Sequence, residues 1–108
     1  MNLTERTTAA LAWIDGQLAI CNAATDGPWE TDLASKHPAI FNDGGDFLAT
    51  DVWPNDATFI ATARTGYPAM MAGMKVAIEG MAVFRRMGMV TESDIQLEQI
   101  LTTIENLN

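Results

Sequence analysis

The sequence predicts an α+β fold in a single domain, residues 1–108, with an N-terminal helix, a small antiparallel sheet and then two or three C-terminal helices. Three observations lead to this prediction. Apolar residues recur at three- and four-residue spacing near both ends of the chain, which indicates helices. Between residues 29 and 53 they stand in short runs around a Gly-rich turn, which indicates strands. The length of 108 residues is typical of one domain.

The first helix is expected over residues 4–22. Its apolar stripe consists of Leu11, Ile14, Leu18 and Cys21. Either Thr4 or Asn2 can cap the first turn, and Gly27-Pro28 lies beyond the end of the helical pattern. Cys21 is the only cysteine, so it has no partner within the chain for a disulfide, and we interpret it as a small buried hydrophobe.

A hairpin is predicted at Asn42–Asp46, between apolar runs at 39–41 and 47–53. Gly-Gly tolerates the positive φ angles of tight turns, and the neighbouring Asn and Asp side chains can bond the local backbone. Residues 29–32 are expected to add a third strand at the edge. The acidic residues of the turn lack the alternating oxygen ligands of a calcium loop, so we interpret this segment as a turn.

The central helical region is expected to open at Pro54-Asn55-Asp56, with Asn55 or Asp56 as the cap. Gly66 and Pro68 then predict a break near Gly66 and a new helix up to Met87. This second helix and the Gly88-Met89 pair after it are rich in methionine. The methionines are Met70, Met71, Met74, Met81, Met87 and Met89. The methionines suit either core packing or an adaptable surface for a partner, including a second copy of the chain.

After Met89-Val90, the last helix is expected to start at a variant capping box formed by Thr91 and Asp94. Its apolar face comprises Ile95, Leu97, Ile100, Leu101, Ile104 and Leu107. An apolar face at a chain end predicts that this helix is held against the rest of the fold.

The charge balance excludes some partners. Fourteen acidic and six basic residues give a net charge of −8, which opposes binding to a phosphate backbone or an anionic membrane. Charged residues interrupt every long apolar segment, so no membrane span is expected. The N-terminus lacks the pattern of a secretory signal, which predicts a cytoplasmic protein. We therefore expect neither direct nucleic-acid binding nor membrane association.

No complete catalytic apparatus is recognisable in the sequence. His37 is the only histidine, and neither a Gly-x-Ser-x-Gly turn, a phosphate-binding Gly-rich loop nor a Cys-x-x-Cys pair is present. Pro38 places His37 at an exposed strand entry. The sequence thus predicts no enzyme, no metal site and no cofactor.

Two stretches resemble a known family. They read Ala24-Thr25-Asp26-Gly27-Pro28-Trp29-Glu30 and Asn55-Asp56-Ala57-Thr58-Phe59-Ile60-Ala61-Thr62-Ala63-Arg64, the second followed by Tyr67-Pro68-Ala69-Met70-Met71. Over about residues 11–78 the chain is similar to the Ead-like early proteins of lambdoid and related phages. It departs from that pattern at Asp26, where proline is common, and in C-terminal helices that carry less charge than usual.

The resemblance implies a phage accessory protein without enzymatic activity. By analogy with phage counter-defence proteins, it suggests a sponge that sequesters a cyclic nucleotide or an ADP-ribose-type immune signal in the host cytoplasm. We expect a homodimer or a higher homo-oligomer. The alternative is a protein-binding inhibitor that blocks a host enzyme through its acidic surface or its Met-rich helix.

The family-like stretches contain the residue types that a small anionic nucleotide requires. Trp29 and Phe59 offer aromatic rings for a base, Asn55 an amide, and Arg64 a guanidinium for phosphate. Each also has a structural interpretation. The two aromatic residues suit the core, Asn55 suits a helix cap, and Arg64 suits an ion pair with Asp51, Asp56 or Glu30.

Overall fold

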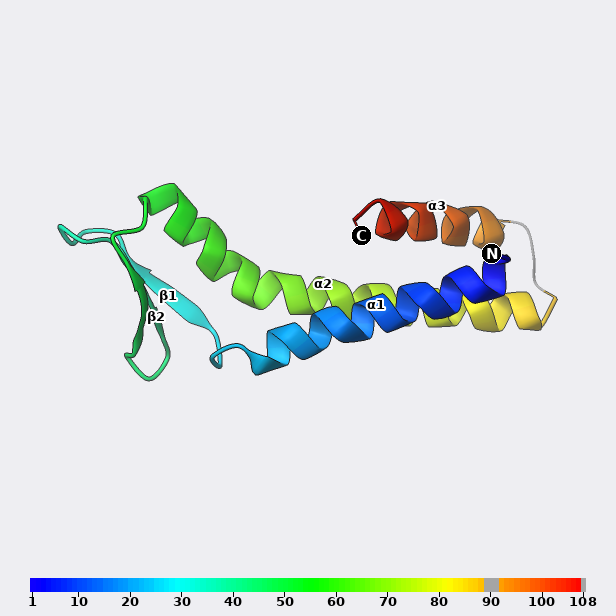
Figure 1. The fold of residues 1–108 in the computed structure, drawn as a ribbon, viewed down its shortest axis with the longest axis horizontal. Helices are drawn as coiled ribbons and strands as arrows, with labels where there is room; N and C mark the ends of the chain where they lie inside the picture. Colours follow the sequence, from blue (N-terminus) through cyan, green and yellow to red (C-terminus); the bar gives the residue numbers. More distant parts are fainter. Residues whose placement is uncertain (89–91, 108) are drawn as a thin grey trace. The chain divides into compact units, whose positions relative to one another are not determined.

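The computed structural model describes residues 1–88 and 92–107 and confirms the α+β class (Figure 1). The elements in chain order are α1 (Leu3–Ala23), β1 (Trp29–Asp32), β2 (Ala39–Asn42), β3 (Phe47–Thr50), α2 (Pro54–Arg86) and α3 (Glu92–Leu107). The contacts divide the chain into two compact units. Unit 1 comprises Met1–Leu18 and Met71–Asn108, and unit 2 comprises Ala19–Met70, so α1 and α2 each run through both.

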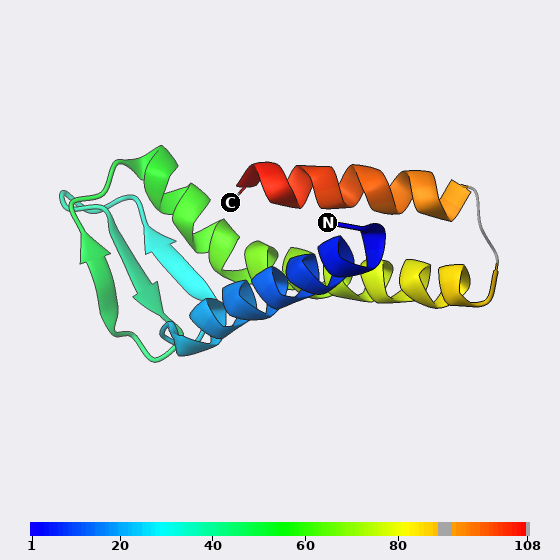
Figure 2. The same cartoon turned by 45° about the vertical axis from the view of Figure 1, so that its right-hand side comes forward.

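Unit 1 is built from the first part of α1, the second part of α2 and α3, as two views show (Figures 1 and 2). Its core consists of Ala10, Ile14, Met71, Ile78, Leu97, Leu101 and Ile104. The predicted stripe of α1 and the predicted face of α3 therefore both contribute to this core. Ile95 and Leu107 of that predicted face are instead exposed. The capping box of α3 depends on Thr91, which, like Met89-Val90, lies outside the described residues.

Asn2 is the cap of α1. Its Oδ1 accepts a hydrogen bond from the amide of Glu5 at 2.8 Å, and its carbonyl accepts one from the amide of Arg6 at 3.0 Å. These bonds satisfy amides that have no partner within the helix. Of the two residues that the sequence offered, the structure selects Asn2.

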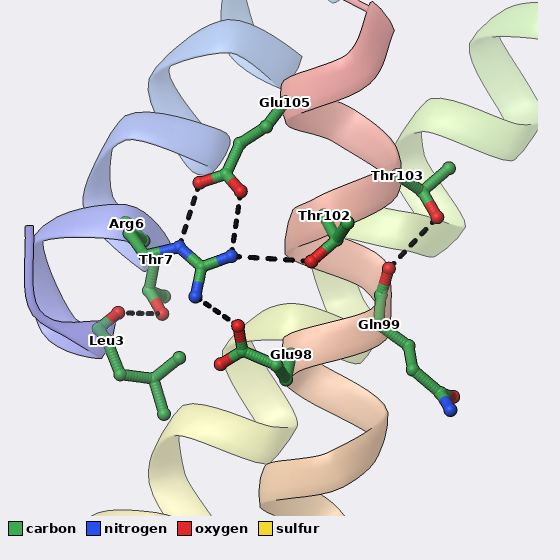
Figure 3. A network of polar contacts seen from close by, with 8 residues as sticks. All are labelled: Leu3, Arg6, Thr7, Glu98, Gln99, Thr102, Thr103 and Glu105. Carbon is green, nitrogen blue, oxygen red and sulfur yellow. Dashed lines mark hydrogen bonds and ion pairs between the residues drawn. The ribbon is translucent and has the colours of Figure 1, made fainter.

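Arg6 joins α1 to α3 within unit 1 (Figure 3). Its Nε and Nη2 donate to the two carboxylate oxygens of Glu105 at 2.9 and 2.7 Å, and its Nη1 pairs with Glu98. The hydrogen bonds to Glu105 and Glu98 raise the pKa of Arg6, and the hydrogen bond from Arg6 lowers the pKa of Glu105. More than 90 residues separate Arg6 from Glu98 and Glu105 in the sequence, so no local sequence pattern predicts this network.

We expect Glu105→Gln to lower the melting temperature at neutral pH and to lose that deficit in acid. Because Arg6 depresses the pKa of Glu105 in the folded state, the carboxylate contributes stability above the unfolded pKa of about 4.3. This contribution is lost as the pH falls through the lower folded pKa. Melting curves from neutral pH to about pH 3 check this, with Glu30→Gln on β1 as a control of equal charge. A deficit that stays constant into acid would contradict the prediction.

The sheet of unit 2 is an antiparallel meander in the order β1-β2-β3. Ile40 on the central strand pairs with Thr31 on one side and Ala49 on the other, and only 1% of it is exposed. The register shifts between Ile40 and Phe41, whose partners are Ala49 and Phe47, so the additional residue of the bulge is Leu48 on β3. The third, edge strand predicted over residues 29–32 is confirmed.

The hairpin turn lies where the sequence predicts it. The amide of Gly45 donates to the carbonyl of Asn42 at 3.0 Å, and the amide of Asp46 donates to Asn42 Oδ1 at 2.8 Å. Gly45 has a φ of 83°, a conformation that favours glycine. β3 ends at Thr50, earlier than the predicted run to residue 53, because Asp51 adopts a φ of 58° and leaves the extended conformation.

Two predictions about α2 are wrong. The helix begins at Pro54, whose missing amide suits a first helical position, so Trp53 is the capping position and neither Asn55 nor Asp56 is. The carbonyl of Trp53 accepts from the amide of Ala57 at 2.9 Å. The expected break near Gly66 is also absent, since the helix continues through Pro68 to Arg86. Proline removes one main-chain donor, and the residues that follow it, Ala69-Met70-Met71-Ala72, are good helix formers.

Within the described residues, no helix is both long enough and apolar enough to cross a membrane.

Candidate functional site

Arg64 and Trp29 lie together in unit 2, as the sequence predicted for a binding site. The guanidinium carbon of Arg64 is 5.7 Å from the centroid of the Trp29 ring. One carbonyl holds both side chains, because Thr25 O accepts from Trp29 Nε1 at 3.0 Å and from Arg64 Nε at 3.1 Å. The turn after α1 is thereby joined to α2, and Arg64 has a fixed position over the indole.

Gly27 allows this close approach. A Cβ built at Gly27 would lie 3.0 Å from Arg64 Cγ, tighter than nearly all side-chain contacts. A side chain at this position would require the stem of Arg64 to move by a few tenths of an ångström. Sequence reasoning interpreted Gly27-Pro28 only as the end of the helical pattern and missed its contact with Arg64.

A shallow depression of about 400 Å³ lies beside the guanidinium. It is lined by Gly27, Pro28, Arg64, Thr65 and Pro68. We call it the Arg64 depression. The two prolines give it an apolar surface, and Arg64 gives it a positive charge. Thr65 and the prolines were not among the predicted site residues, because only the fold brings the turn at Gly27-Pro28 to this side of α2.

The ion pair expected for Arg64 is absent. Within the described part of the chain, no carboxylate lies within 4.0 Å of its nitrogens, including those of Asp51, Asp56 and Glu30. Asp51 instead lies 2.5 Å from His37 Nδ1, and both of these side chains are well exposed. The side chain of Arg64 is half-buried, and its hydrogen bond to Thr25 uses Nε. Neither terminal nitrogen has a hydrogen-bond partner among the described residues.

Asn55 and Phe59 do not join Arg64. Asn55 lies nine residues earlier on α2, about 14 Å along the helix axis at 1.5 Å per residue. Phe59 precedes Arg64 by five residues, which turns it roughly 140° around the helix. Its side chain is 74% exposed, so the core position expected for Phe59 is also wrong. Trp29 is half-buried, which leaves part of the indole at the surface.

The chemistry that this arrangement offers is anion binding. A guanidinium donates two parallel hydrogen bonds to a phosphate or carboxylate, and the Thr25 carbonyl already orients it. Among the residues that the structure describes, no group of three His, Cys, Asp or Glu side chains could hold a metal ion. Comparisons with family models, with curated proteins and with solved structures find no match.

Proposed function

We propose that the protein binds a small phosphate-bearing ligand of the nucleotide class at the Arg64 depression and performs no chemistry on it. The observation that carries this proposal is Arg64 itself. It is held by a backbone carbonyl, free of any carboxylate within ion-pair distance among the described residues, and placed at the edge of a depression. In a chain with a net charge of −8, Arg64 provides a local positive charge that can attract an anion.

The geometry supports a particular arrangement of the ligand. The phosphate would accept from the two terminal nitrogens of Arg64, because Nε is engaged with Thr25. The guanidinium covers one face of Trp29, so a base would rest against Pro28 and Pro68 rather than on that face. This proposal keeps Arg64 and Trp29 of the four predicted ligand-binding residues and replaces Asn55 and Phe59.

The biological role that fits this site is the sequestration of a signal. The resemblance to Ead-like phage early proteins favours a phage accessory protein, and a sponge for a cyclic nucleotide or an ADP-ribose-type immune signal needs affinity without turnover. One guanidinium in a shallow depression supplies part of that affinity. A homodimer or higher homo-oligomer would bring together several such sites and raise it.

The test is calorimetric titration with cyclic dinucleotides, cyclic trinucleotides and cyclic ADP-ribose isomers. We expect at least one to bind, and we expect Arg64→Gln to weaken it by about 1.5 kcal/mol or more, roughly tenfold, because a hydrogen bond to a charged group is lost. Lys36→Gln is the matched control. It removes the same charge from an exposed loop of unit 2 and should leave the affinity unchanged.

A second variant separates the position of Arg64 from its charge. Gly27→Ala keeps every charge, but its new methyl group requires the arginine stem to shift by a few tenths of an ångström. We expect it to lower the affinity while the circular dichroism spectrum stays that of the parent protein. No heat with any of the three ligand classes, or equal affinities for Arg64→Gln and Lys36→Gln, would rule out the proposed site.

The second candidate function is a protein-binding inhibitor, and exposed apolar residues of α2 favour it. Phe59 and Met70 are 74% and 67% exposed, and aromatic and methionine side chains are enriched in protein interfaces. Charge complementarity to a chain of −8 requires a partner with a basic rim around an apolar centre. Phe59→Ser should abolish such inhibition and leave nucleotide binding intact, whereas Arg64→Gln should do the reverse.

A further inference from the structure

A second and larger hollow lies within unit 1, apart from the Arg64 depression. Its volume is about 580 Å³, within the range of small-molecule sites. We call it the Arg86 groove. Its lining includes Thr4 and Leu11 of α1, Glu79, Val83 and Arg86 of α2, and Leu97 of α3. Its surface is mostly apolar, and Glu79, Arg85 and Arg86 supply the charged groups.

The two ends of the groove differ in polarity. The start of α1 lies beside the later turns of α2, and the two helices run in opposite directions there (Figure 2). Of the lining residues on α2, Glu79 is the first and Arg86 the last, so the two stand at opposite ends of the part that this helix contributes. The seven residues between Glu79 and Arg86 span about 10 Å along α2. The Arg86 end is therefore positive and the end with the exposed Glu79 is negative, so the carboxylate of a ligand belongs at the Arg86 end.

The basic residues near this groove are not equivalent. Arg85 pairs with Asp94, Nε to Oδ1 at 3.7 Å. Arg86 is exposed, and among the side chains that the structure describes, those of residues 1–88 and 94–107, no carboxylate lies within ion-pair distance of it. The Thr7 and Thr8 hydroxyls along the lining already donate to carbonyls of their own helix, at 2.8 and 3.1 Å. Arg86 is thus the group in the groove that a ligand anion can neutralise.

We propose that the Arg86 groove binds an unbranched aliphatic carboxylate, with its carboxylate on Arg86 and its chain along Val83, Leu97 and Leu11. Charge complementarity at the Arg86 end selects the carboxylate, since Arg85 is paired with Asp94, and the repulsion from Glu79 excludes a second carboxylate at the other end. The net charge of −8 disfavours ligands with more negative charge. A chain of roughly eight carbons matches the length of the groove, given carbon–carbon bonds near 1.5 Å. This site uses none of the residues of the Arg64 depression.

The experiment is a titration of the full chain with hexanoate, octanoate and decanoate, all below the concentrations at which they form micelles. Each added methylene should strengthen binding by about fourfold while the groove has room for it. An affinity that does not change with chain length would overturn the proposal.

Variants assign the two ends of the ligand. Arg86→Gln should weaken octanoate about tenfold and leave 1-octanol, which has no charge, unchanged. Val83→Ser, at a partly exposed position of the lining, should weaken both ligands. Lys36→Gln is the control for charge and should change neither. Equal losses for octanoate and octanol in Arg86→Gln would place the carboxylate elsewhere and refute the assignment.

Discussion

Leu101→Ala is expected to destabilise the protein by about 2–5 kcal/mol, the range measured for truncating a fully buried leucine. None of Leu101 is exposed, and it belongs to the core of unit 1 together with Ile78 and Ile14. Three helical segments close around it, so the cavity left by the lost methyl groups has little means to collapse. Against a total stability of about 5–15 kcal/mol, this loss is large. Urea denaturation followed by circular dichroism measures it.

Leu107→Ala is the matched control for that experiment. It makes the same change on the same helix, but 61% of Leu107 is exposed. Its removal should shift the stability by less than about 0.5 kcal/mol, as surface substitutions usually do. Equal effects of the two variants would mean that α3 does not pack as described.

Ile40→Ala is expected to cost about 2–5 kcal/mol for the same reason. Ile40 lies on the central strand of the sheet, paired on both sides and 1% exposed. Alanine also has a lower preference for strands than a β-branched residue. Hydrogen exchange read by nuclear magnetic resonance localises the loss, since the amides of β1, β2 and β3 should lose protection. Ile20→Ala, at a 66% exposed position of unit 2, is the control.

The two core variants together test the prediction of a single domain. Domains that unfold as one cooperative unit lose protection everywhere when either core is damaged. Leu101→Ala should then lower protection in the sheet, and Ile40→Ala should lower it in α3. Losses confined to the unit that carries the substitution would instead describe two folding units joined by α1 and α2.

Most of the fold followed from local patterns. The stripe with Ile14 and Cys21, the Asn42–Asp46 turn and the face with Leu97 and Leu101 each reflect a period or a turn chemistry that acts within a few residues. The predicted break near Gly66 is wrong, because the low helix propensity of Gly66 and Pro68 does not end α2. A proline weakens a helix locally, but tertiary packing and neighbouring residues decide whether the helix ends.

The candidate site was only half predictable. Residue type pointed to Trp29 and Arg64, which the structure places together, and also to Phe59, which helical geometry turns away from Arg64. The acceptor that holds the pair is the backbone carbonyl of Thr25, and a carbonyl has no signature in a sequence. The network of Arg6 with Glu98 and Glu105 was missed for another reason, since it joins opposite ends of the chain.

Two adjacent methionines of α2 provide a built-in chemical probe of the folded state. Met70 is 67% exposed, whereas Met71 is 3% exposed and lies in the core of unit 1. Peroxide should therefore convert Met70 to its sulfoxide quickly and reach Met71 only when the helices separate. The ratio of the two products, read by mass spectrometry of one short peptide, would report opening of this core in any solution, without a label or a substitution.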